Sequence, residues 1–514
     1  MATYLLGLDV GTTGSKALLI SADGALKVSA TTEYPMYAPQ PLWAEQAPED
    51  WWSATVASIR RVLSEGEVAP SDVASVGLTG QMHGLVLLDA HGAVLRPCIM
   101  WNDQRTAAQC AAITAKVGSG NALRLTGNPV LPGFTAPKIL WVREHEPEVF
   151  ERIAKVLLPK DYVRFRLTEG LYSEVSDASG TALFDVANRQ WSRPMLEALG
   201  LPSQWLPEVT ESPVASASVS RRGAREVGLL EGTPVVSGAG DQAAQAVGTG
   251  IIHEGLVSAT IGTSGVVFAP SSTYRVEPEG RLHAFCHAVP GMWHLMGVML
   301  AAGGSFRWYR DTLGDVEQIR ARELQCDPYD LLTEAAAAVP AGSEGLLFLP
   351  YLSGERTPYQ DPDARGVFFG LTLRHGKAHL TRAVLEGVAY GLRDCLELVR
   401  AEGLTVDQVR ASGGGARSAL WRQILADVFG TEIVTVGSAE GAAFGAALLA
   451  GVGVGVYQDV GEACAETIHP TSSTWPGPAA SVYAAHYPRY RALYRALAGE
   501  FKLAARSRAS ASET

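Results

Sequence analysis

A chain of 514 residues is too long for one ordinary hydrophobic core, so its length indicates at least two domains. With 47% hydrophobic and 18% charged residues, the composition is typical of a folded globular protein and excludes a disordered one. A formal net charge of −11 argues against nucleic acid as a partner, because neutralising phosphates requires a basic surface.

The cysteines and the apolar stretches give no sign of export or of a membrane span. All six cysteines stand singly, without a Cys-x-x-Cys pair, so neither a zinc site nor a disulfide framework is indicated. Asp9 interrupts the first apolar run, and no basic residues precede it as in an export signal. The longest uncharged stretch, residues 441–458, is rich in glycine and alanine and predicts a buried helix followed by a loop. We therefore expect a cytoplasmic protein without membrane contact.

Residues 4–20 predict two strands joined by a turn of glycine and threonine. The turn lies in the segment Asp-Val-Gly-Thr-Thr-Gly-Ser-Lys at positions 9–16. Such a hairpin differs from the strand-to-helix passage of a Walker phosphate loop, yet its backbone N–H groups and Lys16 can bind phosphate oxygens. Asp9 can hold a hydrated Mg²⁺, which prefers few carboxylates and several waters. An ordinary hairpin turn explains the segment equally well when it is considered alone.

Two polar clusters follow this hairpin. A strand ends in Gly-Leu-Thr-Gly-Gln-Met-His-Gly at positions 77–84, and Trp101, Asn102 and Asp103 follow a second apolar run. A lone histidine such as His83 is more often structural than functional. Several polar clusters at strand ends in one domain are nevertheless what a small polar ligand requires, because each of its hydroxyls needs a fixed partner.

The segment 235–244, near the middle of the chain, predicts a buried strand, a tight glycine turn and the start of a helix. Asp241 stands at the end of the turn, where the ends of parallel strands commonly line a ligand crevice. Its carboxylate is either a helix N-cap or a general base that faces a substrate hydroxyl. On this segment alone the N-cap is the better interpretation, because Asp is a common cap residue.

The hairpin pattern recurs about half a chain later. Residues 256–261 lead into the turn Gly-Thr-Ser-Gly at positions 262–265, and a second apolar run follows. A repeat at this separation predicts two similar domains, joined near residues 246–256, that present phosphate-binding hairpins to a shared cleft. Chance recurrence of four small residues is the alternative, and the flanking strands, which recur too, weaken it.

These motifs resemble those of the FGGY family of carbohydrate kinases. The first hairpin matches the family's Asp-x-Gly-Thr phosphate motif, and residues 133–142 and 366–386 resemble its two signatures. Residues 351–358 and 412–418 fit further family motifs. The resemblance runs from about residue 4 to residue 500, and several long motifs in the same order are highly specific.

The resemblance implies a role for each matching residue. Asp241 corresponds to the catalytic base, and Met82 and His83 stand where members that phosphorylate xylulose contact the sugar. The expected sugar site also includes Trp101, Asn102, Asp103 and Gln242, and the expected metal ligand is Asp9. The implied nucleotide contacts are Thr12, Thr13, Gly14 and Lys16 in the first hairpin, Gly262, Thr263 and Ser264 in the second, and Gly303, Gly413, Gly414, Gly415, Ala416 and Ser418 beyond it.

One position departs from the pattern. Members that phosphorylate xylulose often carry Asn directly after the catalytic Asp, whereas this chain has Gln242, as glycerol kinases do. Glutamine keeps the amide group and adds a methylene, so this position bears on which sugar is preferred.

The resemblance implies an α/β fold of two actin-like ATPase (ribonuclease H-like) domains with an interdomain cleft. The expected domains cover residues 1–248 and 249–503, and the composition of residues 504–514 predicts a frayed tail. The implied activity is ATP-dependent phosphorylation of D-xylulose, with ATP and Mg²⁺ as cofactors and a small-molecule ketose as partner. A homodimer is the oligomeric state considered. The alternatives are a kinase of the same family for ribulose, gluconate or glycerol, and a non-catalytic sugar sensor on the same fold.

Overall fold

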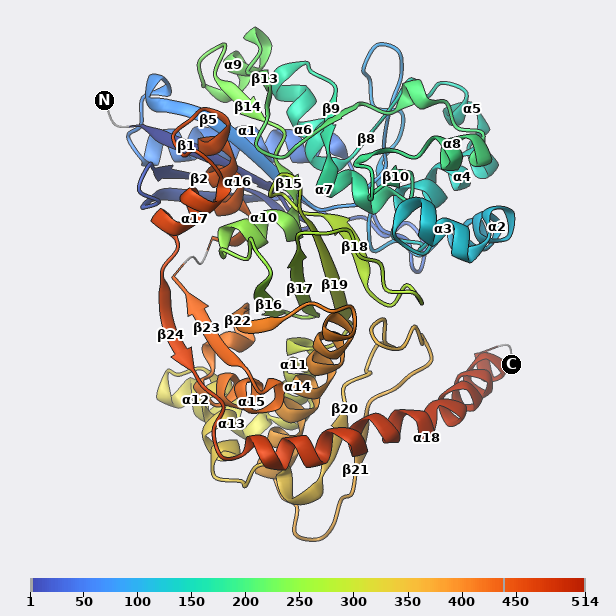
Figure 1. Cartoon of the computed structure of the whole chain (residues 1–514), viewed down its shortest axis with the longest axis vertical. Helices are drawn as coiled ribbons and strands as arrows, with labels where there is room; N and C mark the ends of the chain where they lie inside the picture. Colours follow the sequence, from blue (N-terminus) through green and yellow to red (C-terminus); the bar gives the residue numbers. More distant parts are fainter. Residues whose placement is uncertain (1–2, 438–439, 513–514) are drawn as a thin grey trace.

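The computed structural model describes residues 3–437 and 440–512, and it has two α/β domains, each built on a seven-stranded sheet (Figure 1). The order of the N-terminal sheet is β13 (Ala215–Ser218), β14 (Pro234–Val236), β5 (Val73–Gly80), β1 (Tyr4–Val10), β2 (Gly14–Ser21) and β3 (Leu26–Glu33), with β15 (Ala239–Gly240) also paired to β5. The order of the C-terminal sheet is β18 (His283–Cys286), β19 (Trp293–Met299), β17 (Gly265–Ser271), β16 (Gly255–Ile261), β22 (Val406–Ser412), β23 (Glu432–Val436) and β24 (Pro470–Thr474). The predicted two-domain α/β fold is confirmed.

Helices and short strands surround the two sheets. The helices up to the middle of the chain are α1 (Pro48–Glu65), α2 (Ala107–Val117), α3 (Ser119–Thr126), α4 (Thr135–His145), α5 (Pro147–Phe150), α6 (Pro159–Thr168), α7 (Val175–Ala178), α8 (Arg193–Leu199), α9 (Arg221–Val227) and α10 (Asp241–Gly248). Those that follow are α11 (Gly303–Leu313), α12 (Asp315–Leu324), α13 (Pro328–Ala337), α14 (Lys377–Ala401), α15 (Ala419–Phe429), α16 (Gly441–Gly453), α17 (Val460–Thr467) and α18 (Ala480–Ser512). The short strands are β4 (Glu45–Gln46), β6 (Val86–Leu88), β7 (Cys98–Ile99), β8 (Lys155–Leu157), β9 (Tyr172–Glu174), β10 (Phe184–Asp185), β11 (Gln190–Trp191), β12 (Glu208–Thr210), β20 (Leu347–Leu349) and β21 (Val367–Phe369), and the 3-10 turns near the site are η2 (Ser179–Thr181) and η5 (Gly414–Arg417).

The two sheets repeat the same central strands. In the N-terminal sheet β1 pairs antiparallel with β2 and parallel with β5. In the C-terminal sheet β16 pairs antiparallel with β17 and parallel with β22. The antiparallel pairs turn at residues 11–13 and 262–264, so both predicted hairpins and the internal repeat are confirmed.

Helix α16 is the buried helix that the glycine- and alanine-rich stretch predicts, and it lies on the N-terminal sheet. A Cβ added to Gly7 or Gly77 would stand 2.1 Å and 1.9 Å from the carbonyl oxygens of Ala443 and Ala446, respectively. These glycines of β1 and β5 therefore let the helix backbone lie directly on the strands. Helices α16 and α17 thus cross back to the first domain, after the strands β22 and β23 of the second (Figure 1). The domain boundaries drawn along the chain stay a prediction, and they do not follow the packing of this returning segment.

Helix α10 crosses α16 at an equally short range. A Cβ added to Gly445 would stand 1.8 Å from the carbonyl oxygen of Ala244, and one added to Gly248 would stand 2.3 Å from that of Gly441. Helix α10 ends the N-terminal domain and leads directly to β16, the first strand of the second sheet. The helix that begins with Asp241 is therefore held rigidly at the junction of the two domains.

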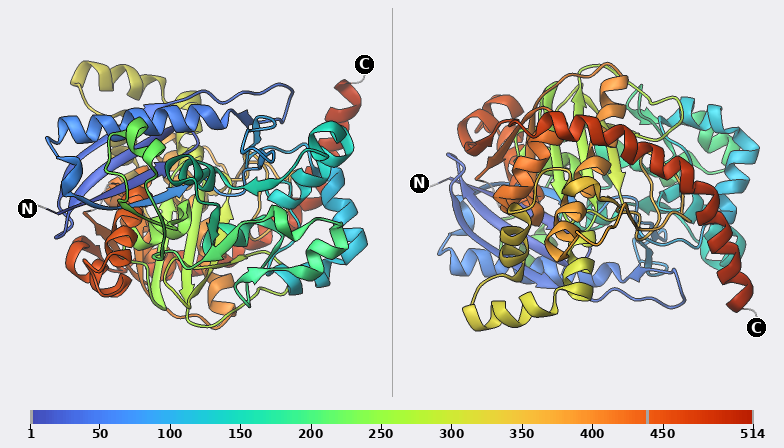
Figure 2. Two further views of the ribbon diagram at one scale, coloured as in Figure 1. Left: turned by 90° about the horizontal axis from the view of Figure 1, so that it is seen from above. Right: turned by 90° about the horizontal axis from the view of Figure 1, so that it is seen from below.

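The last helix, α18, packs on the C-terminal domain through the buried side chains of Tyr483, Tyr487, Tyr490 and Phe501. Its final turns project on the side where α2 and α3 lie (Figure 2). The stretch expected to fray belongs to this helix as far as Ser512, and residues 513–514 lie outside the described part of the chain. Among the described residues, no helix combines the length and the apolar character that crossing a bilayer requires.

Candidate active site

Asp241 is the first residue of α10, directly after the short strand β15. Its carboxylate accepts a hydrogen bond from the backbone N–H of Gln242 (2.7 Å), while Gly240 occupies the N-cap position. The interpretation of Asp241 as the N-cap is therefore wrong. Burial, and next the charge of Asp9, raise the pKa of the Asp241 carboxyl to about 7. A carboxyl that titrates near neutrality suits the transfer of a proton.

Asp9 lies at the end of β1, next to the first hairpin turn. Its Oδ1 is buried without a hydrogen-bond partner, and burial raises the pKa of the carboxyl to about 6 against the opposing charge of Lys16. An orphaned carboxylate oxygen at a phosphate-type hairpin fits a hydrated Mg²⁺, which needs only one or two carboxylates. Within the described residues, no group of three or more His, Cys, Asp or Glu side chains is arranged to hold a metal ion, so water and phosphate would have to supply the other ligands.

The first hairpin is tied to the neighbouring loops through Thr12. The indole N–H of Trp101 donates to Oγ1 of Thr12 (3.1 Å), whose hydroxyl lies 3.3 Å from Oε1 of Gln81. The amide of Gln46 donates to the carbonyl oxygen of Thr12 (2.7 Å). Across the domain junction, Nζ of Lys16 forms an ion pair with Glu440 (3.0 Å). The hairpin is thus linked to β4 and to the loops that follow β5 and β7.

Met82 lies against the segment that leads to Asp241. A Cβ added to Gly240 would stand 2.9 Å from Sδ of Met82, so the thioether packs directly on the residue before Asp241. Only glycine leaves this space free. The structure therefore brings together Met82 and Asp241, which lie far apart in the sequence.

His83, the next residue, has a positive φ of 69°, which is uncommon for any residue except glycine. Its Nδ1 lies 2.6 Å from the carbonyl oxygen of Gly180 in η2, and its ring stacks on Phe134 with the centroids 4.8 Å apart. Burial lowers the pKa of His83 to about 3, so the imidazole is neutral. His83 is therefore held in one orientation at the edge of the N-terminal domain.

Two residues of α4 hold the backbone of His83 in this unusual conformation. Nζ of Lys138 donates to the carbonyl oxygens of His83 and Gly133, at 2.8 Å each, and the hydroxyl of Thr135 donates to the same oxygen of His83 (3.1 Å). Burial lowers the pKa of Lys138 to about 7. Sequence reasoning used this motif only for the family resemblance and assigned no role to either residue.

The expected sugar contacts at residues 101–103 have different environments. Trp101 is 40% exposed and reaches the first hairpin as described above, and Oδ1 of Asn102 is buried without a partner, so both can meet a ligand. Asp103 is completely buried, and its carboxylate accepts from the backbone N–H of Ala44 (2.6 Å) and pairs with Arg105 (2.7 Å). This geometry gives Asp103 the task of supporting the loop, and it leaves the carboxylate out of a sugar's reach.

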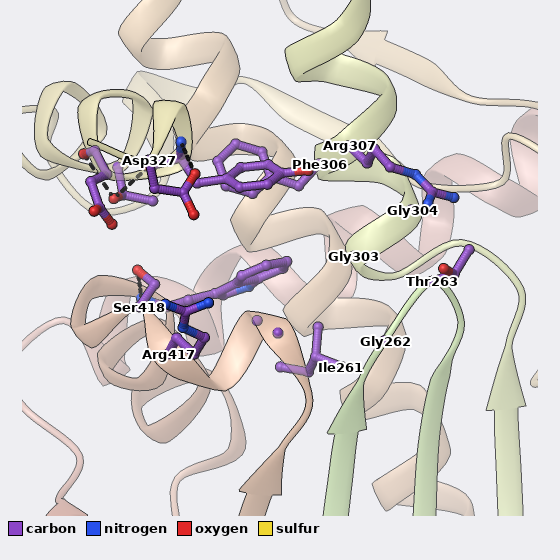
Figure 3. A pocket seen from close by; sticks show the side chains of 16 residues that line it. Ile261, Gly262, Thr263, Gly303, Gly304, Phe306, Arg307, Asp327, Arg417 and Ser418 are labelled. Atoms are coloured by element: carbon purple, nitrogen blue, oxygen red, sulfur yellow. Dashed lines mark hydrogen bonds between the residues drawn. The ribbon is translucent and has the colours of Figure 1, made fainter. Parts of the chain in front are cut away.

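A cavity of about 350 Å³ lies in the C-terminal domain, between η5 with the start of α15 on one side and α11 with α13 on the other (Figure 3). A cavity of this size suits a small organic ligand. The N–H groups of Gly303 and Gly304 donate to the carbonyl oxygens of Gly262 (2.8 Å) and Thr263 (3.0 Å), so the start of α11 is bonded to the second hairpin. The hairpin therefore forms one wall of the cavity.

The cavity contains six of the nine nucleotide contacts expected in and beyond the second hairpin. Those that line it are Gly262, Thr263, Gly303, Gly414, Gly415 and Ser418. Ser264 lies in the hairpin turn outside the lining, and Gly413 and Ala416 line a neighbouring cavity of about 610 Å³. Thr12, Thr13, Gly14 and Lys16 belong to the other domain. The lining residues that sequence reasoning missed include Phe306, Arg307, Asp327, Tyr329 and Trp421. The amphipathic helix after the glycine pair at 303–304 is the signal that points to the first two.

Comparison with known families covers both domains. The N-terminal domain of the FGGY family of carbohydrate kinases matches residues 4–248, and the C-terminal domain of the same family matches residues 257–454. The chain belongs to the FGGY family of carbohydrate kinases. The predicted enzyme class is thereby confirmed.

This FGGY kinase resembles named relatives along nearly its whole length. It is 42% identical over 496 residues to the xylulose kinase of Escherichia coli (strain K12), covering 96% of this chain and 99% of the relative. It is 33% identical to the gluconokinase of Bacillus subtilis (strain 168), covering 87% of each chain. The crystal structure of a xyloylose kinase from Brucella ovis superposes with a TM-score of 0.88 at 39% identity, covering 96% of this chain and 99% of that one.

Proposed function

We propose that this carbohydrate kinase transfers the γ-phosphoryl group of ATP to the primary hydroxyl of D-xylulose, which gives D-xylulose 5-phosphate and ADP. The observation that carries the proposal is the position of Asp241. Burial and the charge of Asp9 at the first hairpin raise the pKa of its carboxyl to about 7. Asp241 also directly follows Gly240, the residue on which Met82 packs. Similarity to kinases named for xylulose supports the choice of sugar.

Asp241 would act as the general base. In its deprotonated form it accepts the proton of the attacking hydroxyl while that oxygen bonds to the γ-phosphorus and the bond to the ADP oxygen breaks. Phosphoryl transfer asks little covalent work of a protein, so the positioning of the two substrates dominates. His83, held by Gly180 and Lys138, would orient the sugar, and Trp101 would connect the sugar loop to the first hairpin.

The cavity of the C-terminal domain would take the adenosine, and the two hairpins would face the phosphates. Lys16 would exchange its ion pair with Glu440 for a phosphate oxygen. Mg²⁺ held by Asp9 would supply neutralisation of the triphosphate charge. The isolated Oδ1 of Asp9 supports this assignment.

A coupled ADP-release assay over a panel of pentuloses, aldonates and polyols tests the proposal. We expect turnover that depends on D-xylulose and on Mg²⁺, and almost none in Asp241→Asn. Activity restricted to an aldonate or to glycerol would contradict the choice of sugar while leaving the kinase mechanism in place.

A kinase for gluconate is the second candidate, because the gluconokinase relative covers most of the chain. A sugar sensor without catalysis is a third, and the near-neutral pKa of Asp241 opposes it, since a sensor needs no base. A sensor would bind sugar without releasing ADP in the same assay. We also propose a cytoplasmic location and a homodimer, and mass photometry of the purified protein tests the dimer.

A further inference from the structure

A segment of the C-terminal domain, Glu355–Thr357, lies beside β19 and the chain that leads into β18. The backbone N–H of Thr357 donates to the carbonyl oxygen of Val298 (3.1 Å), and the Thr357 hydroxyl donates to that of Arg281 (3.0 Å). Oε1 of Glu355 accepts from the backbone N–H of Leu300 (3.0 Å). The side chains of Glu355 and Thr357 are thus buried in their own domain, which anchors the residue between them.

Arg356, the residue between them, has a side chain that is not bonded to this segment. Thr357 is bonded to Arg281, two residues before His283, and the His283 ring lies 5.8 Å from the ring of Phe134, which stacks on His83. Together with burial, the nearby charge of Arg356 lowers the pKa of both histidines. Within the described chain, the guanidinium makes no hydrogen bond and no ion pair. Burial raises the pKa of the adjacent Glu355 carboxyl to about 8, and its Oε1 accepts from the backbone N–H groups of Leu300 and Arg356 and not from the guanidinium. The N–H groups of this half-buried guanidinium have no protein acceptor and can therefore donate to a ligand oxygen.

The hydrogen-bonding state of His83 follows from its contacts. A carbonyl oxygen can only accept, so the nitrogen 2.6 Å from the Gly180 oxygen, Nδ1, carries the proton. The ring is neutral, so Nε2 keeps its lone pair and can only accept. Arg356, in contrast, can only donate. The two domains therefore face one another with an acceptor on one side and a donor on the other.

A ligand that satisfies both groups must offer a hydroxyl to His83 and an acceptor oxygen to Arg356. Met82 packs on Gly240, the residue before Asp241, and His83 is the next residue along the chain, so this pair belongs to the same site as the base. An open-chain ketose has that pattern at the end opposite the phosphorylated hydroxyl: a C1 hydroxyl adjoins the C2 carbonyl. A polyol lacks the carbonyl, whereas an aldonate replaces this end by a carboxylate.

We propose that Arg356 is a specificity-determining residue that reaches across from the C-terminal domain and donates to the carbonyl oxygen of an open-chain ketose, while Nε2 of His83 accepts from the neighbouring hydroxyl. This inference rests on the proposed function. It adds a contact from the second domain to a sugar site otherwise built from the first. Sugar binding and the approach of the two domains are thereby coupled, since only the closed arrangement satisfies both groups.

The test compares D-xylulose with D-arabitol and xylitol, the two pentitols obtained by reducing its carbonyl. In Arg356→Met, we expect the KM for xylulose to rise roughly 10–10²-fold, as for the loss of a hydrogen bond to a charged group. The KM values for the pentitols and for ATP should hardly change, so the preference for the ketose collapses. Arg356→Lys keeps the charge without the planar fork and should recover part of the preference.

Arg374→Met is the matched control, because Arg374 is an exposed arginine of the same domain paired with Glu344 (3.0 Å), and it should behave as the wild type. A folded Arg356→Met enzyme with an unchanged preference for xylulose over pentitols would overturn the inference alone, and so would an equal loss for ketose and pentitol. If the methionine variant does not fold, the lysine variant decides by the same ratio. Wild-type protein that phosphorylates only an aldonate would overturn this inference and the proposed function together.

Discussion

The ends of β5 and β22 occupy equivalent places in the two sheets, yet the residues that follow them differ in kind. Each strand lies parallel to the first strand of a hairpin, β1 or β16, and a glycine stands at the end of each: Gly80 closes β5, and Gly413 directly follows β22. Beyond β5 the chain places the side chains of Met82 and His83, the latter in a left-handed conformation. Beyond β22 it places glycines, and a Cβ added to Gly414 would meet no atom within 4 Å. A sugar needs polar side chains at fixed points, whereas a nucleotide needs room beside a backbone.

The two hairpins differ in the same sense. The first carries Asp9, whose charge adds to burial in raising the pKa of Asp241, and Lys16, which forms an ion pair with Glu440. The second has Thr260 in the place of Asp9, and its carbonyl oxygens are bonded to the start of α11. Repetition of a fold has thus supplied two similar loops, of which only the first carries charged chemistry. The comparison predicts that changes at the two strand ends have separable effects.

The largest effect is expected between the two ends, at Asp241. Asp241→Asn keeps an oxygen that can accept from the N–H of Gln242, so α10 should still begin correctly. Turnover should nevertheless fall roughly 10²–10⁴-fold, because the amide cannot accept the proton. Both KM values and the melting temperature should stay close to those of the wild type. Steady-state kinetics with thermal unfolding measures this, and an active Asn variant would remove Asp241 from the chemistry.

The second-largest effect is expected for a change that disturbs sugar binding alone. A Cβ at Gly180 would stand 2.3 Å from Nδ1 and Cε1 of His83, so Gly180→Ala must displace the imidazole. We expect the KM for the sugar to rise roughly 10–10²-fold, the usual cost of a misplaced contact, with the KM for ATP unchanged. Gly120→Ala, at a position where an added Cβ meets nothing within 4 Å, is the control. Equal increases for sugar and ATP would contradict the separation of the two ends.

The pH dependence of the reaction tests the role of Asp241, which lies between the two strand ends. Asp241 accepts a proton only when it is deprotonated, and its pKa is raised to about 7 by burial and next by Asp9. Therefore kcat/KM for the sugar should fall about tenfold per pH unit below about pH 7 and level off above it. The residual activity of Asp241→Asn provides the control, since any slope due to ATP itself persists in that variant. A slope shared by both proteins would not belong to Asp241.

The smallest effect is expected for a change that disturbs nucleotide binding alone. Gly414 lines the cavity, but its added Cβ would touch no protein atom, so Gly414→Ala should fold as well as the wild type. The methyl group would occupy ligand space and raise the KM for ATP roughly tenfold, as expected for one extra carbon in a pocket. The KM for the sugar should not move. Gly499→Ala, exposed on α18 with nothing within 4 Å, is the control, and an unaltered KM for ATP would place the nucleotide elsewhere.

Much of the site could be predicted because it depends on short motifs. Glycine turns after buried strands predicted both hairpins and the segment before Asp241. This was possible because the alternation of apolar runs and turn residues lies within a short stretch of sequence. The function of Asp103 could not be read in this way. Its carboxylate lies in a polar cluster typical of a ligand site, yet Arg105 and Ala44 occupy it completely. Burial of a charged group depends on what folds over it, which a short motif does not contain.

The amino-acid sequence by itself determined the hairpins, the repeat and the buried character of α16, because turn geometry and apolar periodicity act between near neighbours. Only the tertiary structure decided that α16 returns to the first sheet, where its backbone lies on Gly7 and Gly77. It also decided the raised pKa of Asp241 and the contact of the His83 ring with Phe285 of the second domain. These properties arise from desolvation and from charges brought together across hundreds of residues, and such contacts exist only once both domains have packed.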